Sequence, residues 1–135
     1  ADFNFDTYKT MVEDMGVGLK DKMTKISTGM AAKVRLAAAL SRKAKLYLLD
    51  EPEAALSPMR LMELMCFIHQ LEKQNSQLII STHSPILMAY PGAEVLNLTE
   101  EGIRSVSYRE TEHYQITRQF LNNPDQMCRY LFSDD

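Results

Sequence analysis

The stretch that decides the fold is residues 46–52, which read Leu-Tyr-Leu-Leu-Asp-Glu-Pro. The apolar run is too short for a helix, and it stops at two carboxylates followed by a proline. An uninterrupted apolar run is typical of a parallel strand with both faces covered. We therefore expect a buried parallel strand at residues 45–49, which places Asp50 and Glu51 at the carboxyl edge of the sheet, where ligands bind in open α/β folds.

The residues after this strand predict a βαβ unit. Ser57 and Pro58 are an N-cap and a first-turn proline for a helix that ends near Lys73. A second apolar strand is expected at residues 77–81, and the crossover should be right-handed. The expected apolar stripe of the helix comprises Leu61, Leu64, Met65, Ile68 and Leu71.

Helices are expected before this unit and a hairpin after it. Apolar spacing predicts a helix over residues 5–15, and an Ala- and Leu-rich stretch predicts another over residues 28–41. Ser84 and Pro85 begin a short helix. Residues 93–98 and 103–108 read as a β-hairpin, and helical segments follow from Thr111 and from Asn123. The fold class is therefore α/β, with a parallel core and an added antiparallel hairpin.

Composition places the chain among ordinary globular domains. It has 135 residues, 45% of them hydrophobic, and a net charge of -3, so we expect no nucleic-acid partner. No apolar run approaches the roughly 20 residues that span a bilayer, and a cytoplasmic location is expected, peripheral to a membrane only through a partner. Cys66 and Cys128 lack metal-ligand spacing and are expected to be reduced thiols.

Three short segments carry residue types suited to phosphate chemistry. In P-loop ATPases an Asp at a strand end lies beside the Mg²⁺ of the nucleotide, and a neighbouring carboxylate can polarise the attacking water. Asp50 and Glu51 fit that pattern, but an apolar run followed by two acidic residues also occurs in many α/β proteins. His83 follows the second strand directly, where it could contact a γ-phosphate or serve only the fold.

The segment Ile-Ser-Thr-Gly-Met at residues 26–30 opens a helix. A helix N-terminus offers free N–H groups and favours anions. Ser27 can donate a hydroxyl, Thr28 begins the helix, and Gly29 lets the backbone approach a phosphate closely. The alternative is an ordinary N-cap without a ligand.

Taken together and in this order, the three segments resemble the ABC ATPase superfamily over about residues 6–85. Residues 26–30 correspond to its signature motif, Asp50 and Glu51 to its Walker B pair, and His83 to its switch histidine. The resemblance implies a partial P-loop NTPase fold of the ABC type. Residues 1–135 would form a single partial domain, with a helical arm at 1–42, a core at 43–92, and the hairpin and terminal helices at 93–135.

The resemblance also implies roles for these residues. Asp50 would hold Mg²⁺ through water, Glu51 would be the general base, and His83 would sense the γ-phosphate of ATP. Residues 27–29 would close over an ATP bound to an opposing domain. The implied cofactors are ATP and Mg²⁺. The implied partner is a second ABC-type ATPase domain, as in a homodimer, or a segment that bears the Walker A loop, with a transmembrane subunit as a further partner.

Parts of the family pattern differ. The 135 residues contain no Gly-x-x-Gly-x-Gly-Lys-Ser/Thr, and Ser57 replaces the usual Asp of the loop after Walker B. Alternatives are therefore a folded, non-catalytic module, or an accessory subunit that lends its signature motif to a complete ATPase.

The two parts of the chain resemble different relatives. Residues up to Pro52 resemble exporter ATP-binding subunits, whereas later residues resemble soluble ATPases of an AAA/ABC-like group, with a Thr-Glu-His-Tyr tail pattern within residues 111–122. A further hypothesis is thus an engineered or recombined chain, joined near residues 50–52. His113 and Tyr114 in that tail indicate either a second site or a terminal helix that docks on the sheet.

Overall fold

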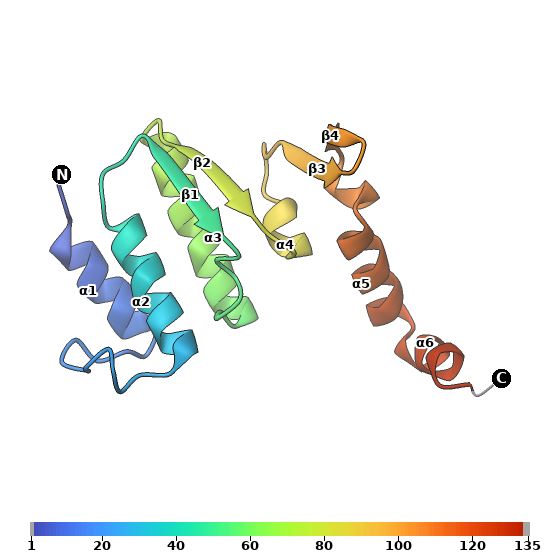
Figure 1. Ribbon diagram of the computed structural model, residues 1–135, viewed down its shortest axis with the longest axis horizontal. Coiled ribbons are helices and arrows are strands. Elements are labelled where there is room, and N and C mark those ends of the chain that lie inside the picture. Colours follow the sequence, from blue (N-terminus) through green and yellow to red (C-terminus); the bar gives the residue numbers. More distant parts are fainter. Residues whose placement is uncertain (1, 134–135) are drawn as a thin grey trace. The chain divides into compact units, whose positions relative to one another are not determined.

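The computed structural model describes residues 2–133, and the chain divides into two compact units at the junction of Thr82 and His83. We call them the N-terminal unit and the C-terminal unit and describe each by itself. Figure 1 shows the elements of both, coloured along the chain.

The N-terminal unit contains the expected βαβ arrangement. Strand β1 (Leu46–Asp50) pairs in parallel with β2 (Gln77–Ser81), with Leu46 opposite Gln77 and Asp50 opposite Ser81. Helix α3 (Pro58–Lys73) connects the two strands and packs against β2 (Figure 1). The α/β class and the parallel pairing are therefore confirmed.

Helix α3 ends where local backbone chemistry requires. Asn75 has a φ of 61°, in the left-handed region that follows many helix C-termini. The Asn75 N–H donates to the carbonyl of Glu72 at 2.9 Å, and the Ser76 N–H donates to that of Leu71 at 3.0 Å. These two bonds form a Schellman motif, which satisfies carbonyls that the helix itself leaves unpaired.

Two further helices complete this unit. Helices α1 (Phe5–Asp14) and α2 (Thr28–Leu40) pack against each other, and the segment before α1 is tied to the end of α2. There the Asn4 N–H donates to the Ser41 carbonyl at 2.8 Å. Buried side chains from these helices and the following turn form an apolar cluster: Met11, Val12, Val17, Leu36, Ala37 and Leu40.

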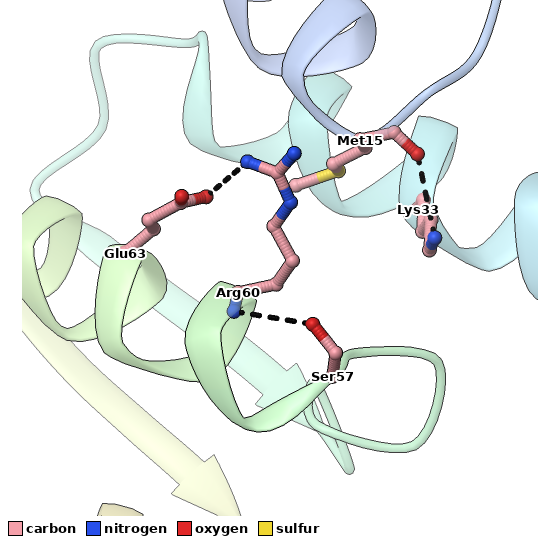
Figure 2. Close-up of polar contacts among 5 residues, drawn as sticks. All are labelled: Met15, Lys33, Ser57, Arg60 and Glu63. Atoms are coloured by element: carbon pink, nitrogen blue, oxygen red, sulfur yellow. Dashed lines mark hydrogen bonds and ion pairs between the residues drawn. The ribbon is translucent and has the colours of Figure 1, made fainter.

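Figure 2 shows polar contacts at the start of α3 and at the end of α1. The Arg60 guanidinium pairs with Glu63 at 2.7 Å, while its backbone N–H donates to the Ser57 hydroxyl at 3.4 Å, as the expected N-cap requires. Lys33 of α2 donates to the carbonyl of Met15 at the end of α1, at 3.3 Å. The Ser57 contact thus satisfies a backbone N–H at the start of α3, and the Lys33 contact satisfies a carbonyl at the end of α1.

The prediction that β1 is buried on both faces is wrong for the residues described. Tyr47 and Leu49 are buried, but Leu48 is 70% exposed and its pairing partner Ile79 is 54% exposed. Side chains alternate between the faces of a strand, and among residues 2–82 the helices leave the Leu48 face uncovered. We call this surface, formed by Leu46, Leu48 and Ile79, the open face.

The C-terminal unit contains a short helix, a hairpin and two terminal helices. Helix α4 (Pro85–Met88) precedes β3 (Val95–Thr99) and β4 (Gly102–Val106), which pair antiparallel. A 3-10 turn, η1 (Tyr108–Glu110), leads into α5 (Glu112–Asn122) and α6 (Pro124–Leu131).

The hairpin is confirmed, although its second strand ends earlier than expected. Ser107 caps η1 instead of extending the strand: its N–H donates to the Glu110 carboxylate at 2.9 Å, and its hydroxyl accepts from Arg109 at 3.3 Å. This local pairing competes with the strand ladder, because Ser favours caps over strands. In the part of the chain that the structure describes, no helix is long and apolar enough to cross a bilayer.

Candidate functional site

The two carboxylates lie at the carboxyl end of β1, as the sequence predicts. Asp50 is the last strand residue and is exposed. Glu51 follows it, also exposed, and its N–H donates to the Ser81 carbonyl at 2.9 Å, which carries the pairing with β2 one residue further. The Glu51 carbonyl accepts from the Ala54 N–H at 3.0 Å, so the chain turns at once away from the sheet.

Glu51 has an uncommon backbone conformation. Its φ is 41°, a left-handed value that residues with a Cβ adopt at a cost of about 1–2 kcal/mol. Such conformations gather at functional sites, where the surrounding structure holds them. Here the bond to Ser81 on one side and the turn to Ala54 on the other hold Glu51 at the sheet edge.

The loop after Glu51 is tied to the end of β2 by a side-chain contact that the sequence did not predict. The Thr82 hydroxyl donates to a carboxylate oxygen of Glu53. The two residues are 29 positions apart in the sequence. Only their places after adjacent strand ends could have indicated the contact.

Ser27 caps α2, so the N-cap prediction for this residue is confirmed. Its hydroxyl oxygen accepts from the Met30 N–H at 3.2 Å. Thr28 is the first residue of the helix, and residues 27–29 are all exposed. A Cβ placed on Gly29 would lie 4.0 Å from that of Ala55, so the helix start lies near the loop that follows Glu51.

A hollow of about 380 Å³ adjoins this helix start. It lies on the segment that precedes α2, and the sequence-based reading found in that segment only a Lys-rich connection. Three cationic side chains, one carboxylate and two apolar residues line it: Lys20, Asp21, Lys22, Lys25, Ile26 and Met30. The excess of positive charge beside free helix N–H groups suits an anionic ligand.

His83 is the first residue of the C-terminal unit, and its imidazole contacts a second one. Its Nδ1 lies 3.0 Å from Nε2 of His113 in α5, and the ring centroids are 5.0 Å apart with planes tilted by 34°. His113 was singled out in the sequence only as part of a tail motif. The expected proximity of His83 to Glu51 joins two separately described units and stays a prediction.

Aromatic and cationic side chains surround the start of α5. The Tyr108 and Tyr114 rings meet edge to face at 5.3 Å, and the Arg118 guanidinium lies 6.0 Å over the Tyr114 ring. The hydrogen bond to Tyr108, with the charge interactions of Tyr108 and Tyr114, raises the pKa of Arg109 above its usual value. The guanidinium is charged in either case, so its role here is contact with the rings.

The residues at the β1 edge fit a magnesium ion held as the resemblance implies. Mg²⁺ is usually bound by one or two carboxylates, with substrate phosphates and waters as the remaining ligands. Asp50 offers one exposed carboxylate beside the hydroxyl-bearing Ser81. Within residues 2–133, no three His, Cys, Asp or Glu side chains gather to hold a metal.

Comparisons with known proteins agree with this reading of the fold. A family model described as "AAA domain, putative AbiEii toxin, Type IV TA system" matches residues 14–89, more than half of the chain. An uncharacterized ABC transporter ATP-binding protein of Haemophilus influenzae is 37% identical over 76 residues, which is 56% of this chain and 29% of that protein. The energy-coupling factor transporter ATP-binding protein EcfA2 of Methanospirillum hungatei is 34% identical over 77 residues, 57% of this chain and 19% of that protein. The matches thus span less than a third of either relative.

Solved structures resemble the chain over most of its length. The cbiO1 protein of Clostridium perfringens, part of the ABC transporter complex cbiONQ, is 25% identical with a TM-score of 0.57. The alignment covers 94% of this chain and 53% of cbiO1. RNase-L Inhibitor, at 21% identity, shares the fold with a TM-score of 0.60, over 90% of this chain and 24% of its own. The chain therefore belongs to the AAA domain family whose model matches residues 14–89, and it is part of an ABC-type nucleotide-binding domain.

Proposed function

We propose that this chain supplies the Walker B pair, the switch histidine and the signature motif of a composite ATP-hydrolysing site. One observation carries the proposal: Asp50 and Glu51 are exposed at the carboxyl end of a parallel strand, in a chain that belongs to an ABC-type family. That edge is where α/β folds bind ligands. The held, left-handed conformation of Glu51 supports a functional role for this turn.

Glu51 acts as the general base in this proposal. Its carboxylate accepts a proton from a water molecule as the water oxygen bonds to the γ-phosphorus of ATP. The bond between that phosphorus and the bridging oxygen of ADP breaks, so that ADP and phosphate are the products. His83 donates a hydrogen bond to an oxygen of the γ-phosphate and stabilises its growing charge.

Asp50 would hold Mg²⁺ through water, and the ion would supply positive charge that neutralises the phosphates. The backbone of Asp50 is held at the sheet edge because its strand is paired along its full length with β2. Removing that carboxylate should weaken MgATP binding, whereas removing the Glu51 carboxylate should spare it.

The signature segment faces a different nucleotide. Ser27, Thr28 and Gly29 present a hydroxyl, free N–H groups and a backbone without a side chain, all exposed at a helix start. The neighbouring hollow with its lysines adds positive charge. Both features suit the phosphates of an ATP bound to an opposing domain, which supports a second ABC-type ATPase domain as the partner, a homodimer included.

The transport relatives suggest a wider assembly. Their names describe ATP-binding proteins of transporters, so a transmembrane subunit is the partner that these names favour, with the chain on the cytoplasmic side. Because the 135 residues contain no Gly-x-x-Gly-x-Gly-Lys-Ser/Thr, a segment that bears the Walker A loop is also needed for the composite site.

A non-catalytic module is the second candidate, favoured by one specific observation. The 135 residues contain no Gly-x-x-Gly-x-Gly-Lys-Ser/Thr, the loop whose N–H groups and lysine grip the phosphates. The carboxylates cannot take over that role, because they repel a triphosphate. On this reading the chain keeps the fold but binds no nucleotide.

Two measurements separate these candidates. Calorimetry first tests MgATP binding to the purified chain, with Asp50→Ala as control. The chain is then joined to a Walker A-bearing segment of an ABC ATP-binding protein, and phosphate release is followed. We expect Glu51→Gln to keep MgATP binding and to lose about 100-fold or more in kcat. If the joined protein binds MgATP and Glu51→Gln hydrolyses it as fast as the unsubstituted form, Glu51 is not the base and the proposal fails.

A further inference from the structure

We propose that Met59, Met62 and Cys66 on the solvent side of α3 form a binding site for monovalent copper, Cu(I). All three residues are exposed, and all three carry sulfur. The site needs no nucleotide and lies on a different element from the carboxylates at the β1 edge.

The three residues lie on one line along the helix. An α-helix has about 3.6 residues per turn, so positions three or four apart are neighbours on its surface, with Cβ atoms about 5–6 Å apart. Met62 follows Met59 by three positions, and Cys66 follows Met62 by four. Methionine is unbranched and turns about three bonds, so each thioether can reach its neighbour along this line.

The exposure of these side chains is unusual, because methionine and cysteine are among the residue types most often buried. Met59 is 70% exposed and Met62 is 51% exposed, and the Cys66 thiol is exposed too. They are not part of the core face of α3, which consists of Leu61, Leu64, Ile68 and Leu71. The solvent side of such a helix ordinarily carries charged and polar residues, whereas here it carries three sulfur atoms.

The donor types select the metal. Thiolate and thioether sulfur are soft ligands that suit Cu(I), whereas Zn²⁺ in proteins takes Cys, His and carboxylate ligands. Binding releases the Cys66 thiol proton to solvent, and the thiolate then neutralises the single charge of the ion. Copper enters and leaves as Cu(I), so no electron is transferred.

The charged neighbours on α3 are compatible with a bound cation. Arg60 lies between the two methionines in sequence, but its guanidinium pairs with Glu63 at 2.7 Å, which offsets its charge. His69 lies three positions after Cys66, and its Nδ1 is 3.6 Å from a carboxylate oxygen of Glu72. The ligand set is therefore the three sulfur atoms, without the imidazole.

Anaerobic titration of the purified chain with Cu(I) tests the site. Bicinchoninate serves as the competing chelator, and its colour reports the copper that the protein has not taken. We expect one Cu(I) per chain. With 13C-labelled methionine methyl groups, we expect the signals of Met59 and Met62 to shift and that of Met23, which is 50% exposed outside α3, to stay in place.

Substitutions at the ligands should weaken this binding. We expect Cys66→Ser, and separately Met59→Leu with Met62→Leu, to lower the affinity for Cu(I) by at least about tenfold, since even the loss of an outer-shell partner costs that much. The matched controls are Cys128→Ser and Met23→Leu, which should leave the affinity unchanged. Leucine resembles methionine in volume and helix propensity, so the folds should persist, and circular dichroism verifies this.

Several results would overturn the proposal. One is Cu(I) binding that survives Cys66→Ser, or that falls as far in the two controls. Unchanged affinity in the methionine double variant would mean that the thioethers are not ligands. One copper per two chains would place the ion between two molecules instead of within α3. Displacement of Cu(I) by excess Zn²⁺ would contradict the soft ligand set.

Discussion

At Glu51, the effect of the backbone conformation on stability can be measured separately from the effect of losing the carboxylate. Its φ of 41° strains any residue that has a Cβ, whereas glycine adopts this region without that cost. We expect Glu51→Gly to be more stable to urea than Glu51→Ala by about 1 kcal/mol, because both lose the carboxylate and only alanine keeps the strain. Equal stability of the two variants would mean that the turn relaxes, and that this conformation is not enforced.

At Gly29, a substitution to alanine should have opposite effects on stability and on nucleotide-dependent association. A Cβ there would lie 4.0 Å from that of Ala55, an ordinary contact, and alanine is the better helix former. We expect Gly29→Ala to raise the free energy of unfolding by about 0.5 kcal/mol, yet to weaken nucleotide-dependent association with an opposing domain, because the methyl group obstructs the phosphates.

Gly16 is the matched control for this substitution. It has a φ of 75°, and although nothing lies within 4 Å of a Cβ placed there, alanine would be strained. Gly16→Ala should therefore cost about 1 kcal/mol in the same urea titration and leave association unchanged. A destabilised Gly29→Ala would contradict the space that the structure shows at that position.

At the scale of elements, the end of α3 makes a prediction of its own. The Schellman motif places Asn75 at a φ of 61°, where glycine is preferred. We expect Asn75→Gly to raise the free energy of unfolding by about 0.5–1 kcal/mol, which is measured as a higher midpoint of thermal unfolding. Asn75→Val should lower it by about 1–2 kcal/mol. The order glycine, asparagine, valine is the test, and any other order would mean that the helix ends differently.

Helix ends were predictable from sequence because their chemistry is local. Ser27, Ser57 and Pro58 stand within a few residues of the groups they cap or begin, and each helix starts where they indicate. Strand burial was not predictable in the same way. The sequence at residues 46–49 shows that the strand is apolar. Whether each face is buried depends on the elements that pack against it, and one face of this strand is exposed.

The candidate site was likewise predictable only in part. Its residue types and their order indicated the ends of β1 and β2, because parallel strands bring their carboxyl ends to one edge. The contacts from Thr82 to Glu53 and from His83 to His113 were not predictable. They join residues 29 and 30 positions apart, and nothing in the local sequence of either partner specifies the other.

For the molecule as a whole, the open face decides how the isolated chain behaves. Parallel sheets are found with both faces covered, and an exposed apolar surface promotes association. Leu48 is 70% exposed and Ile79 is 54% exposed, so neither contributes much burial to the isolated chain. We expect Leu48→Thr with Ile79→Thr to change the free energy of unfolding by less than about 1 kcal/mol, because exposed sites tolerate substitution and Thr suits a strand.

The same double variant should reduce concentration-dependent self-association in sedimentation velocity. Leu64→Ala is the contrasting control: Leu64 is 3% exposed, and its loss should cost about 2–5 kcal/mol without affecting association. If the double variant instead loses as much stability as Leu64→Ala, the open face is covered in solution, because exposed side chains do not contribute that much to the free energy of unfolding. If it remains folded and associates as strongly as the unsubstituted chain, association runs through other surfaces, such as the free edges of the two-stranded sheet.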